Sequence, residues 1–99
     1  MSVLADLSLF PIGKGESVHD DVTRAVRIIR DSGLRYRLGP MGTTMEGDYD
    51  QVMGVVRQCF EELRRDCDRI YMTLKLDYRS SGENRLESKV ATVESALKA

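Results

Sequence analysis

Apolar and polar residues alternate in four short segments of the chain, which is the pattern of β-strands with one buried face. The first segment covers residues 3–10 and the last covers residues 70–77. Between them lie residues 34–38 and residues 42–46, separated by a glycine–proline turn. The sequence therefore predicts four strands, of which the middle two form a hairpin.

The alternation also assigns side chains to the two faces of the predicted sheet. In the first strand one face is wholly apolar and consists of Val3, Ala5, Leu7 and Leu9. In the last strand the predicted buried face consists of Ile70, Met72, Leu74 and Leu76. The opposite face carries Leu4, Phe10 and Tyr71 among polar groups, more apolar surface than a monomer usually exposes. We therefore expect that face to contact another subunit.

Two longer stretches repeat apolar residues at the spacing of amphipathic helices. The first is expected to begin after Ser17, as the N-cap residue, and to end at Gly33. Its apolar stripe consists of Val18, Val22, Ala25, Val26 and Ile29. The second begins after Asp48, with Gln51 in the capping-box position. Its stripe consists of Val52, Val55, Val56, Cys59, Phe60 and Leu63.

A weaker stripe near the C-terminus consists of Leu86, Val90, Val93 and Leu97. It predicts a third helix, which packs either on a neighbouring subunit or on its own sheet. The order of elements is then β-α-β-β-α-β plus this helix. With right-handed crossovers, that order predicts an α+β fold, the ferredoxin-like plait, with a four-stranded antiparallel sheet. We expect residues 1–99 to form a single domain.

Composition excludes several function classes. Fifteen basic residues are balanced by sixteen acidic ones, so the chain lacks the positive charge of a general nucleic-acid binder. No apolar run reaches membrane-spanning length, and the N-terminus does not have the pattern of a signal peptide. We expect a cytoplasmic protein that binds neither nucleic acid nor membrane.

The cysteines and the single histidine do not predict a metal or catalytic site. Cys59 and Cys67 are separated by about 12 Å along a helix, which is too far for a disulfide. His19 lies in a first helical turn, with no nucleophile at a recognisable spacing. We expect no metal, no cofactor and no catalysis, and we interpret Cys59 as a core residue.

The segment 38–47, Leu-Gly-Pro-Met-Gly-Thr-Thr-Met-Glu-Gly, is the strongest candidate for a ligand site. Gly42 allows the backbone to approach another group closely, and Thr43 and Thr44 place hydroxyls on opposite faces of a strand. Because the first and third strands are neighbours in the plait, we expect Met41, Thr43, Thr44 and Glu46 to meet the loop after the first strand. A simple hairpin turn fits the composition as well. The candidate site consists of Ser8, Ile12, Met41, Gly42, Thr43, Thr44 and Glu46.

Several motifs together resemble the small thiamine-binding proteins with a ferredoxin-like fold. They are residues 10–13 (Phe-Pro-Ile-Gly), 15–17 (Gly-Glu-Ser), 32–36 (Ser-Gly-Leu-Arg-Tyr) and, above all, the segment 38–47. The resemblance covers nearly the whole chain. It implies a cytoplasmic homo-oligomer, a tetramer, that binds thiamine or its hydroxymethylpyrimidine part without catalysis.

On this resemblance, Thr43 and Thr44 bond the aminopyrimidine, and Glu46 accepts from its amino group or offsets the thiazolium charge. Lys14 stands where the family usually has a small hydroxyl residue, and the family usually has a second acidic residue near Tyr78. A lysine near the site would favour a phosphorylated ligand or weaken binding of a cation. The alternative is a structural or regulatory oligomer that senses another small metabolite.

Overall fold

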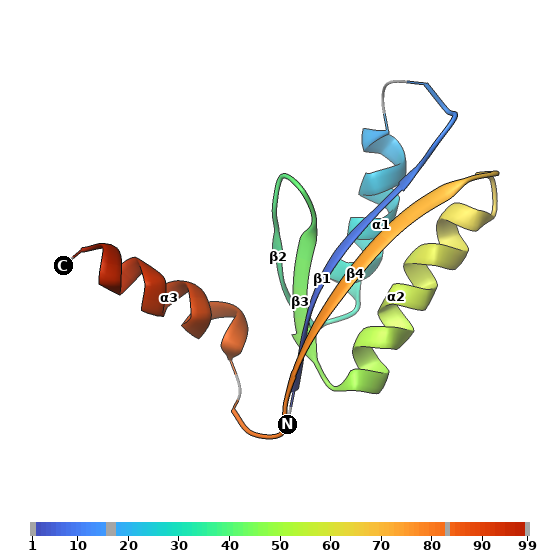
Figure 1. Ribbon diagram of the computed structural model, residues 1–99. Helices are drawn as coiled ribbons and strands as arrows, with labels where there is room; N and C mark the ends of the chain where they lie inside the picture. The colour runs from blue at the N-terminus through green and yellow to red at the C-terminus, as the bar shows by residue number, and fades with distance from the viewer. Residues whose placement is uncertain (1, 16–17, 83, 99) are drawn as a thin grey trace.

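The computed structural model describes residues 2–15, 18–82 and 84–98. These residues form four strands and three helices, and Figure 1 shows how they are arranged. In chain order they are β1 (Ser2–Pro11), α1 (His19–Asp31), β2 (Arg35–Leu38), β3 (Thr43–Gly47), α2 (Tyr49–Arg64), β4 (Ile70–Arg79) and α3 (Arg85–Leu97). The predicted sequence of elements is confirmed.

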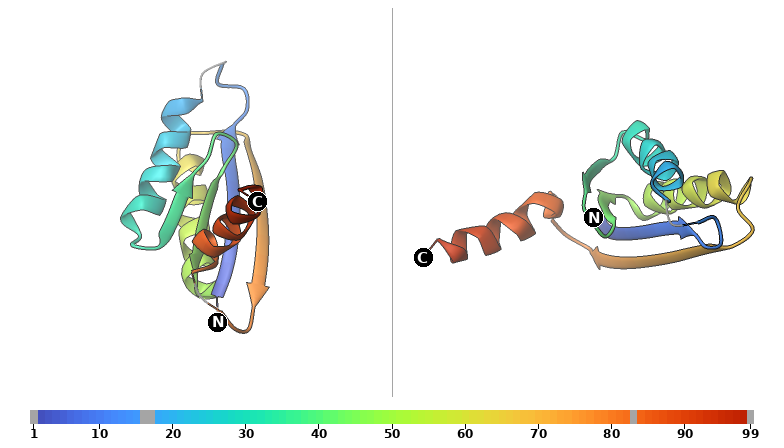
Figure 2. Two further views of the ribbon diagram at one scale, coloured as in Figure 1. Left: turned by 90° about the vertical axis from the view of Figure 1, so that its left-hand side faces the viewer. Right: turned by 90° about the horizontal axis from the view of Figure 1, so that it is seen from above.

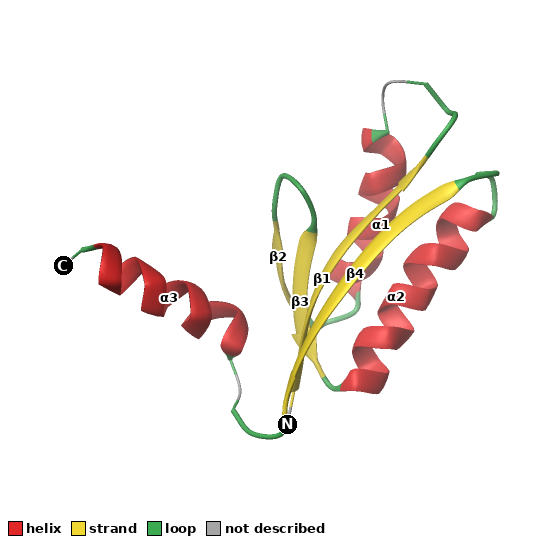
Figure 3. Ribbon diagram, in the orientation of Figure 1, coloured by secondary structure: helices red, strands yellow, loops and turns green. Residues whose placement is uncertain are grey.

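The four strands form one sheet in the order β2-β3-β1-β4, and every neighbouring pair is antiparallel. Helices α1 and α2 lie side by side on one face of this sheet, as Figure 3 and the view from above in Figure 2 show. This is the predicted ferredoxin-like arrangement. The two central strands, β1 and β3, therefore carry most of the buried sheet surface.

The core lies between the helices and the sheet, where the predicted periodicity places it. Val3, Ala5, Leu7 and Leu9 of β1 are buried, together with Met45 of β3. The α2 stripe is buried except for Phe60, which stays half-buried under the Arg64 guanidinium. In α1 only Ala25 and Ile29 are fully buried, whereas Val18, Val22 and Val26 remain half-buried.

The prediction of a buried face on β4 is wrong for two residues. Ile70 and Leu74 pack against the core, but Met72 and Leu76 are 41% and 43% exposed. Their side chains point to the helix side, because they stand opposite the buried Leu9 and Ala5 of β1. They are exposed because β4 is an edge strand that the helices cover incompletely.

The helix ends follow the sequence signals in part. Ser17 lies outside the described residues, and α1 has Val18 as its N-cap residue. Gly33 follows α1 with a φ of +84°, the left-handed conformation expected of a helix stop. At the start of α2, the Asp48 N–H donates to Gln51 Oε1 at 3.3 Å, which confirms the capping box.

Helix α3 leaves the end of β4 and projects away from the two-layer body (Figures 1 and 2). Its first apolar residue, Leu86, is buried, whereas Val93 and Leu97 are 59% and 78% exposed. The predicted helix is confirmed, but most of its apolar stripe faces away from the subunit. Within the described residues, no helix is long and apolar enough to cross a membrane.

Truncation of Leu63 tests the packing of α2 on the sheet. Leu63 has no exposed surface, so Leu63→Ala should lower the free energy of unfolding by about 2–5 kcal/mol. Val93→Ala on α3 is the matched control, with an expected change within about 0.5 kcal/mol. Urea denaturation followed by circular dichroism measures both. Equal effects of the two variants would contradict this account of the core.

Candidate functional site

The candidate site arises because β1 is longer than its neighbour β3. Strand β3 pairs with β1 from Gly47 opposite Val3 to Thr43 opposite Leu7. Beyond that point β1 continues to Pro11, paired only with β4 on its other side. The β2–β3 turn, residues 39–42, curls beside this part of β1, closed by a 2.8 Å bond from Gly39 N–H to Gly42 O.

The direction of the main-chain groups along this part of β1 follows from one hydrogen bond. Ile12 N–H donates to Arg69 O at 2.9 Å, in the same register that joins β1 and β4 throughout. Hydrogen-bonded and non-hydrogen-bonded pairs alternate along an antiparallel ladder. The even-numbered residues of β1 therefore point their main-chain groups toward β4, and the N–H and C=O of Leu9 point the other way, past the start of β3.

A cavity of about 260 Å³ lies at this position, between the end of β1, helix α1 and the hairpin turn. Its α1 wall consists of Val18, Val22, Ala25, Val26 and Ile29. Its other walls consist of residues 7–10 of β1 and residues 38–43 of the hairpin. The half-buried valines of α1 thus remain partly exposed because they face this cavity. An apolar pocket with few polar groups is typical of a small-molecule site.

Four of the seven predicted site residues line this cavity: Ser8, Met41, Gly42 and Thr43. Thr43 is buried and stands opposite Leu7, on the helix side of the sheet. Met41 is 87% exposed in the hairpin turn and forms part of the rim. Ile12, Thr44 and Glu46 are not among the described residues that line it.

Gly42 makes the close backbone approach that the sequence suggests. A Cβ at this position would lie 3.1 Å from the carbonyl oxygen of Leu7 and 3.2 Å from Asp6 Oδ1. A larger residue would fit only if the turn or its neighbours on β1 shifted by a few tenths of an ångström. Gly42 therefore allows two of the cavity walls, the turn and β1, to lie close together.

Thr44 belongs to the open face of the sheet, the face without α1 and α2. Its hydroxyl lies 3.4 Å from Asp6 Oδ1 of β1, and Lys75 Nζ of β4 lies 3.9 Å from the other oxygen of Asp6. The two adjacent threonines thus face opposite sides, as predicted, and only Thr43 reaches the cavity.

Glu46 is buried on the open face and holds the start of α3. Its carboxylate accepts the N–H of Arg85 at 3.0 Å and the N–H of Leu86 at 3.2 Å. The hydroxyl of Ser2 donates to it at 3.2 Å, and the Arg85 guanidinium donates to the carbonyls of Ser2 and Asp77. Burial alone would raise the pKa of Glu46, but these donors and the Arg85 charge hold it below its ordinary value.

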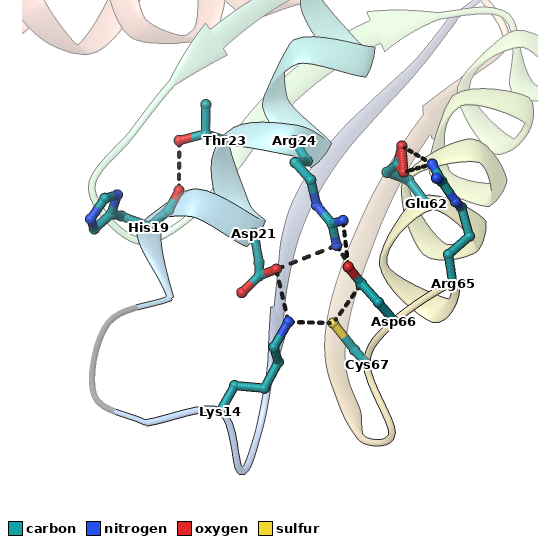
Figure 4. Close-up of polar contacts among 9 residues, drawn as sticks. All are labelled: Lys14, His19, Asp21, Thr23, Arg24, Glu62, Arg65, Asp66 and Cys67. Carbon is teal, nitrogen blue, oxygen red and sulfur yellow. Dashed lines mark hydrogen bonds and ion pairs between the residues drawn. The ribbon is translucent and has the colours of Figure 1, made fainter.

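Lys14 lies in a cluster of charges that joins the loop after β1 to the loop after α2 (Figure 4). Its ammonium is 3.5 Å from Asp21 Oδ1 and 3.8 Å from Cys67 Sγ. Arg24 bridges Asp21 and Asp66, and its hydrogen bonds lower the pKa of Asp66 to about 2. Two cations thus balance two carboxylates, and the positive charge expected beside the ligand site is neutralised.

The same cluster brings three potential metal ligands together. One ligand atom from each of Asp21, Asp66 and Cys67 lies within 4.8 Å of the others. Lys14 and Arg24 already pair with these carboxylates, so the geometry is that of a salt-bridge network. Cys67 is buried, and burial raises the pKa of its thiol. Cys59 is fully buried, and burial raises the pKa of its thiol to about 11, in agreement with its predicted place in the core.

Comparison with known proteins matches this fold and sequence to a family. Residues 5–94 match the family model described as "Thiamine-binding protein". The chain belongs to this thiamine-binding protein family. A UPF0045 protein of Mycobacterium bovis is 41% identical over 98 residues, which is 98% of this chain and 96% of the relative.

Two solved structures of similar proteins share the fold. A hypothetical protein of Methanocaldococcus jannaschii has a TM-score of 0.87 at 32% identity, covering 94% of this chain and 96% of that one. A putative thiamine biosynthesis/salvage protein of Thermotoga maritima has a TM-score of 0.83 at 27% identity, covering 94% and 99%. The family resemblance drawn from the sequence motifs is therefore confirmed.

Sequence reasoning missed two parts of the site of this thiamine-binding family member. Periodicity assigns the half-buried Val22 and Val26 to the apolar stripe of α1, but it does not show that they line a cavity, because a cavity wall and a core have the same periodicity. The direction of the Leu9 main-chain N–H and C=O could not be inferred from its residue type, because every residue except proline has the same two groups. The length difference between the predicted strands, residues 3–10 against 42–46, is the one feature of the sequence from which the gap could be inferred.

Substitution of Glu46 tests its role in holding α3. The pKa of Glu46 is lower in the folded state than in the unfolded chain. The stabilisation that its carboxylate gives is therefore complete above the unfolded-state pKa of about 4.3, and it is lost as the pH falls through the folded-state pKa. Glu46→Gln should remove this acid dependence and speed amide exchange at Arg85 and Leu86, measured by hydrogen–deuterium exchange. Glu94→Gln on α3 is the control. Unchanged exchange in Glu46→Gln would show that α3 is held otherwise.

Proposed function

We propose that this protein binds thiamine or its hydroxymethylpyrimidine part, without catalysis, in the cavity between β1, α1 and the hairpin turn. The observation that carries the proposal is the main-chain edge of Leu9, which presents a donor and an acceptor to an apolar cavity. Membership of the thiamine-binding protein family supports the same ligand.

The chemistry of an aminopyrimidine fits such an edge. Its amino group donates a hydrogen bond, and the adjacent ring nitrogen accepts one, so the ring offers the same pair of groups as a peptide unit. A ring placed beside Leu9 would extend the sheet where β3 stops. The side chains of Val22, Val26 and Leu38 would cover its faces, and burial of these apolar surfaces would supply affinity.

We propose Ser8, Met41, Gly42 and Thr43 as further contact residues. Thr43 brings a hydroxyl to the helix side of the sheet, where it can donate or accept. Met41 is exposed at the rim, and its polarisable sulfur suits a thiazolium ring at the cavity mouth. The carboxylate of Glu46 already accepts hydrogen bonds from Arg85 and Leu86, so we propose no ligand contact for Glu46. We propose none for Ile12 and Thr44 either, because they are not among the described residues that line the cavity.

We also propose a cytoplasmic homotetramer, as the family resemblance implies. The supporting observation is the open sheet face, on which Phe10 and Tyr71 stack with ring centroids 5.6 Å apart. Tyr71 is 53% exposed, and Leu4 lies on the same face. Cover by another subunit would remove this apolar surface from water.

Isothermal titration calorimetry with thiamine, hydroxymethylpyrimidine and oxythiamine tests the ligand proposal. Oxythiamine has an oxo group in place of the amino group, so it offers the wrong pattern to Leu9. Thiamine and hydroxymethylpyrimidine should bind saturably, with at least tenfold weaker binding of oxythiamine, about 1.4 kcal/mol. Val26→Phe, which fills the cavity, should abolish binding, whereas Val90→Phe on α3 should not.

Two results would contradict this proposal. Equal affinities for thiamine and oxythiamine would show that the aminopyrimidine does not bind the main-chain groups of Leu9. Absence of binding by a folded protein would favour the alternative, a structural or regulatory oligomer that senses another small metabolite. Circular dichroism spectra of the wild type and both variants establish that each is folded.

Tyr71→Lys tests the open-face contact. A lysine here would bring charge into the proposed contact, so the molar mass measured by light scattering should fall by half. Folding should persist, since Tyr71 is half-exposed in the subunit. Lys98→Ala, at the far end of α3, serves as the control. An unchanged mass in Tyr71→Lys would exclude this face as the contact.

A further inference from the structure

The cavity between β1, α1 and the hairpin turn has no charged side chain among the described residues that line it. Thiamine carries a positive thiazolium ring, and a cation that loses hydration in an apolar site is destabilised unless an anion lies nearby. The carboxylate of Glu46 holds the start of α3 instead. Asp6 approaches Gly42 from the open face, where it contacts Thr44 and Lys75. The described walls of the cavity therefore offer the thiazolium no counter-charge.

A second cavity, of about 300 Å³, adjoins the first between α1 and the edge strand β2, and we call it the α1–β2 groove. Val22, Val26 and Leu38 line both cavities. The two valines are half-buried, whereas Leu38 is 62% exposed. The groove is lined in addition by His19, Thr23, Arg27, Arg30 and Tyr36.

The charged groups of the α1–β2 groove are all cationic or can become so. Residues 19, 23, 27 and 30 follow one another at spacings of three or four, so they share one face of α1. Figure 4 shows His19 and Thr23 on the side of α1 away from the cluster around Lys14. None of the described residues that line the groove is acidic. The groove is therefore separate from the neutralised cluster and attracts an anion.

Both arginines of the groove keep donors for such an anion. Within the described part of the chain, Arg27 forms no ion pair. Arg30 donates to Asp31 through Nε at 2.8 Å, and a guanidinium has four further N–H donors on its two terminal nitrogens. Asp31 thus offsets the charge of Arg30 but not that of Arg27. We assign His19 no role, because its ring lies 3.1 Å from Asp20.

We propose that the site takes thiamine as its phosphate ester, with the rings in the cavity and the phosphate in the α1–β2 groove, bound by Arg27 and Arg30. The inference rests on the proposed function, because it keeps the aminopyrimidine beside Leu9. The phosphate supplies the counter-charge that the cavity walls lack. A phosphate monoester carries about −1.5 to −2 charges at pH 7, and a guanidinium can bind two of its oxygens at once.

The order of residues along α1 and the hairpin suits such a ligand. The thiazolium ring is expected at the cavity mouth beside Met41, and Leu38 precedes the turn that carries Met41. An arm that leaves the ring over Leu38 enters the groove, because Leu38 lines both cavities. Arg27 directly follows Val26, and Arg30 lies about 6 Å beyond Val26 along the helix. Both arginines are exposed, so their guanidinium groups can close over the phosphate.

Lys14 is the other cation that a phosphate could meet, and the structure favours the arginines. The ammonium of Lys14 is 3.5 Å from Asp21, and Asp66 also acts on its charge. A phosphate beside Lys14 would therefore approach two carboxylates. In the α1–β2 groove the carboxylate nearest to the arginines is bonded to Arg30 through Nε alone, which leaves Arg27 unopposed.

Isothermal titration calorimetry with thiamine and thiamine monophosphate at low ionic strength tests the inference. The wild type should bind the monophosphate at least tenfold more tightly than thiamine. The double variant Arg27→Gln/Arg30→Gln should bring the ratio of the two affinities close to one, without weakening the binding of thiamine. Added sodium chloride should lower the ratio in the wild type, because it screens exposed charges. Circular dichroism establishes that each protein is folded.

Two single variants serve as matched controls. Arg57→Gln removes an exposed arginine of α2 that is not among the described residues lining either cavity. Lys14→Gln removes the cation of the loop after β1. Both should keep the wild-type preference for the monophosphate.

The possible failures of this inference and of the proposed function give different results. Equal affinities of the wild type for thiamine and its monophosphate would overturn the inference and leave the proposed function standing. A preference that survives in Arg27→Gln/Arg30→Gln, or that is lost in Lys14→Gln, would place the phosphate elsewhere. Absence of binding of both ligands by the folded wild type would contradict the proposed function itself.

Discussion

The main-chain hydrogen bonds of β1 are the constraint on which the rest of this structure depends. Each residue of a central strand directs its N–H and C=O to one neighbour, and the next residue directs them to the other. Along residues 3–7 both neighbours are present, and the core lies there. Beyond Leu7 only β4 remains, so Leu9 turns its main-chain groups toward the cavity. A length difference between two strands thus creates the candidate site.

Most of the fold could be predicted from the sequence, because periodicity reports which side chains share a face. It correctly placed Val3, Ala5, Leu7 and Leu9 on one side, and it placed Met72 and Leu76 of β4 on the same side. It could not show that these last two are exposed, since exposure depends on how far α2 reaches across the sheet. The alternation of apolar residues shows on which face of the sheet a side chain lies, but it does not show whether a helix covers that side chain.

The site was less predictable, because its chemistry comes partly from the main chain and partly from distant contacts. Glu46 has the residue type of a ligand group, yet its partners Arg85 and Leu86 lie about forty positions further along the chain. Lys14 suggested a positive charge beside the ligand site, but the carboxylate of Asp21 forms an ion pair with it and neutralises that charge. The close approach at Gly42 was predictable, because a glycine beside another strand typically lets the two backbones lie close together. Leu9 was not, because any residue type would supply the same two groups.

The ligand cavity and the β4 edge use different sets of residues on one ladder. The main-chain N–H and C=O groups of the odd-numbered residues of β1 point toward β3 and the cavity. Those of its even-numbered residues bond to β4. The outer edge of β4 then belongs to its own even-numbered residues, which stand opposite the odd-numbered residues of β1. A change in the position of β4 can therefore reach the cavity through β1, which pairs with β4 along its whole length.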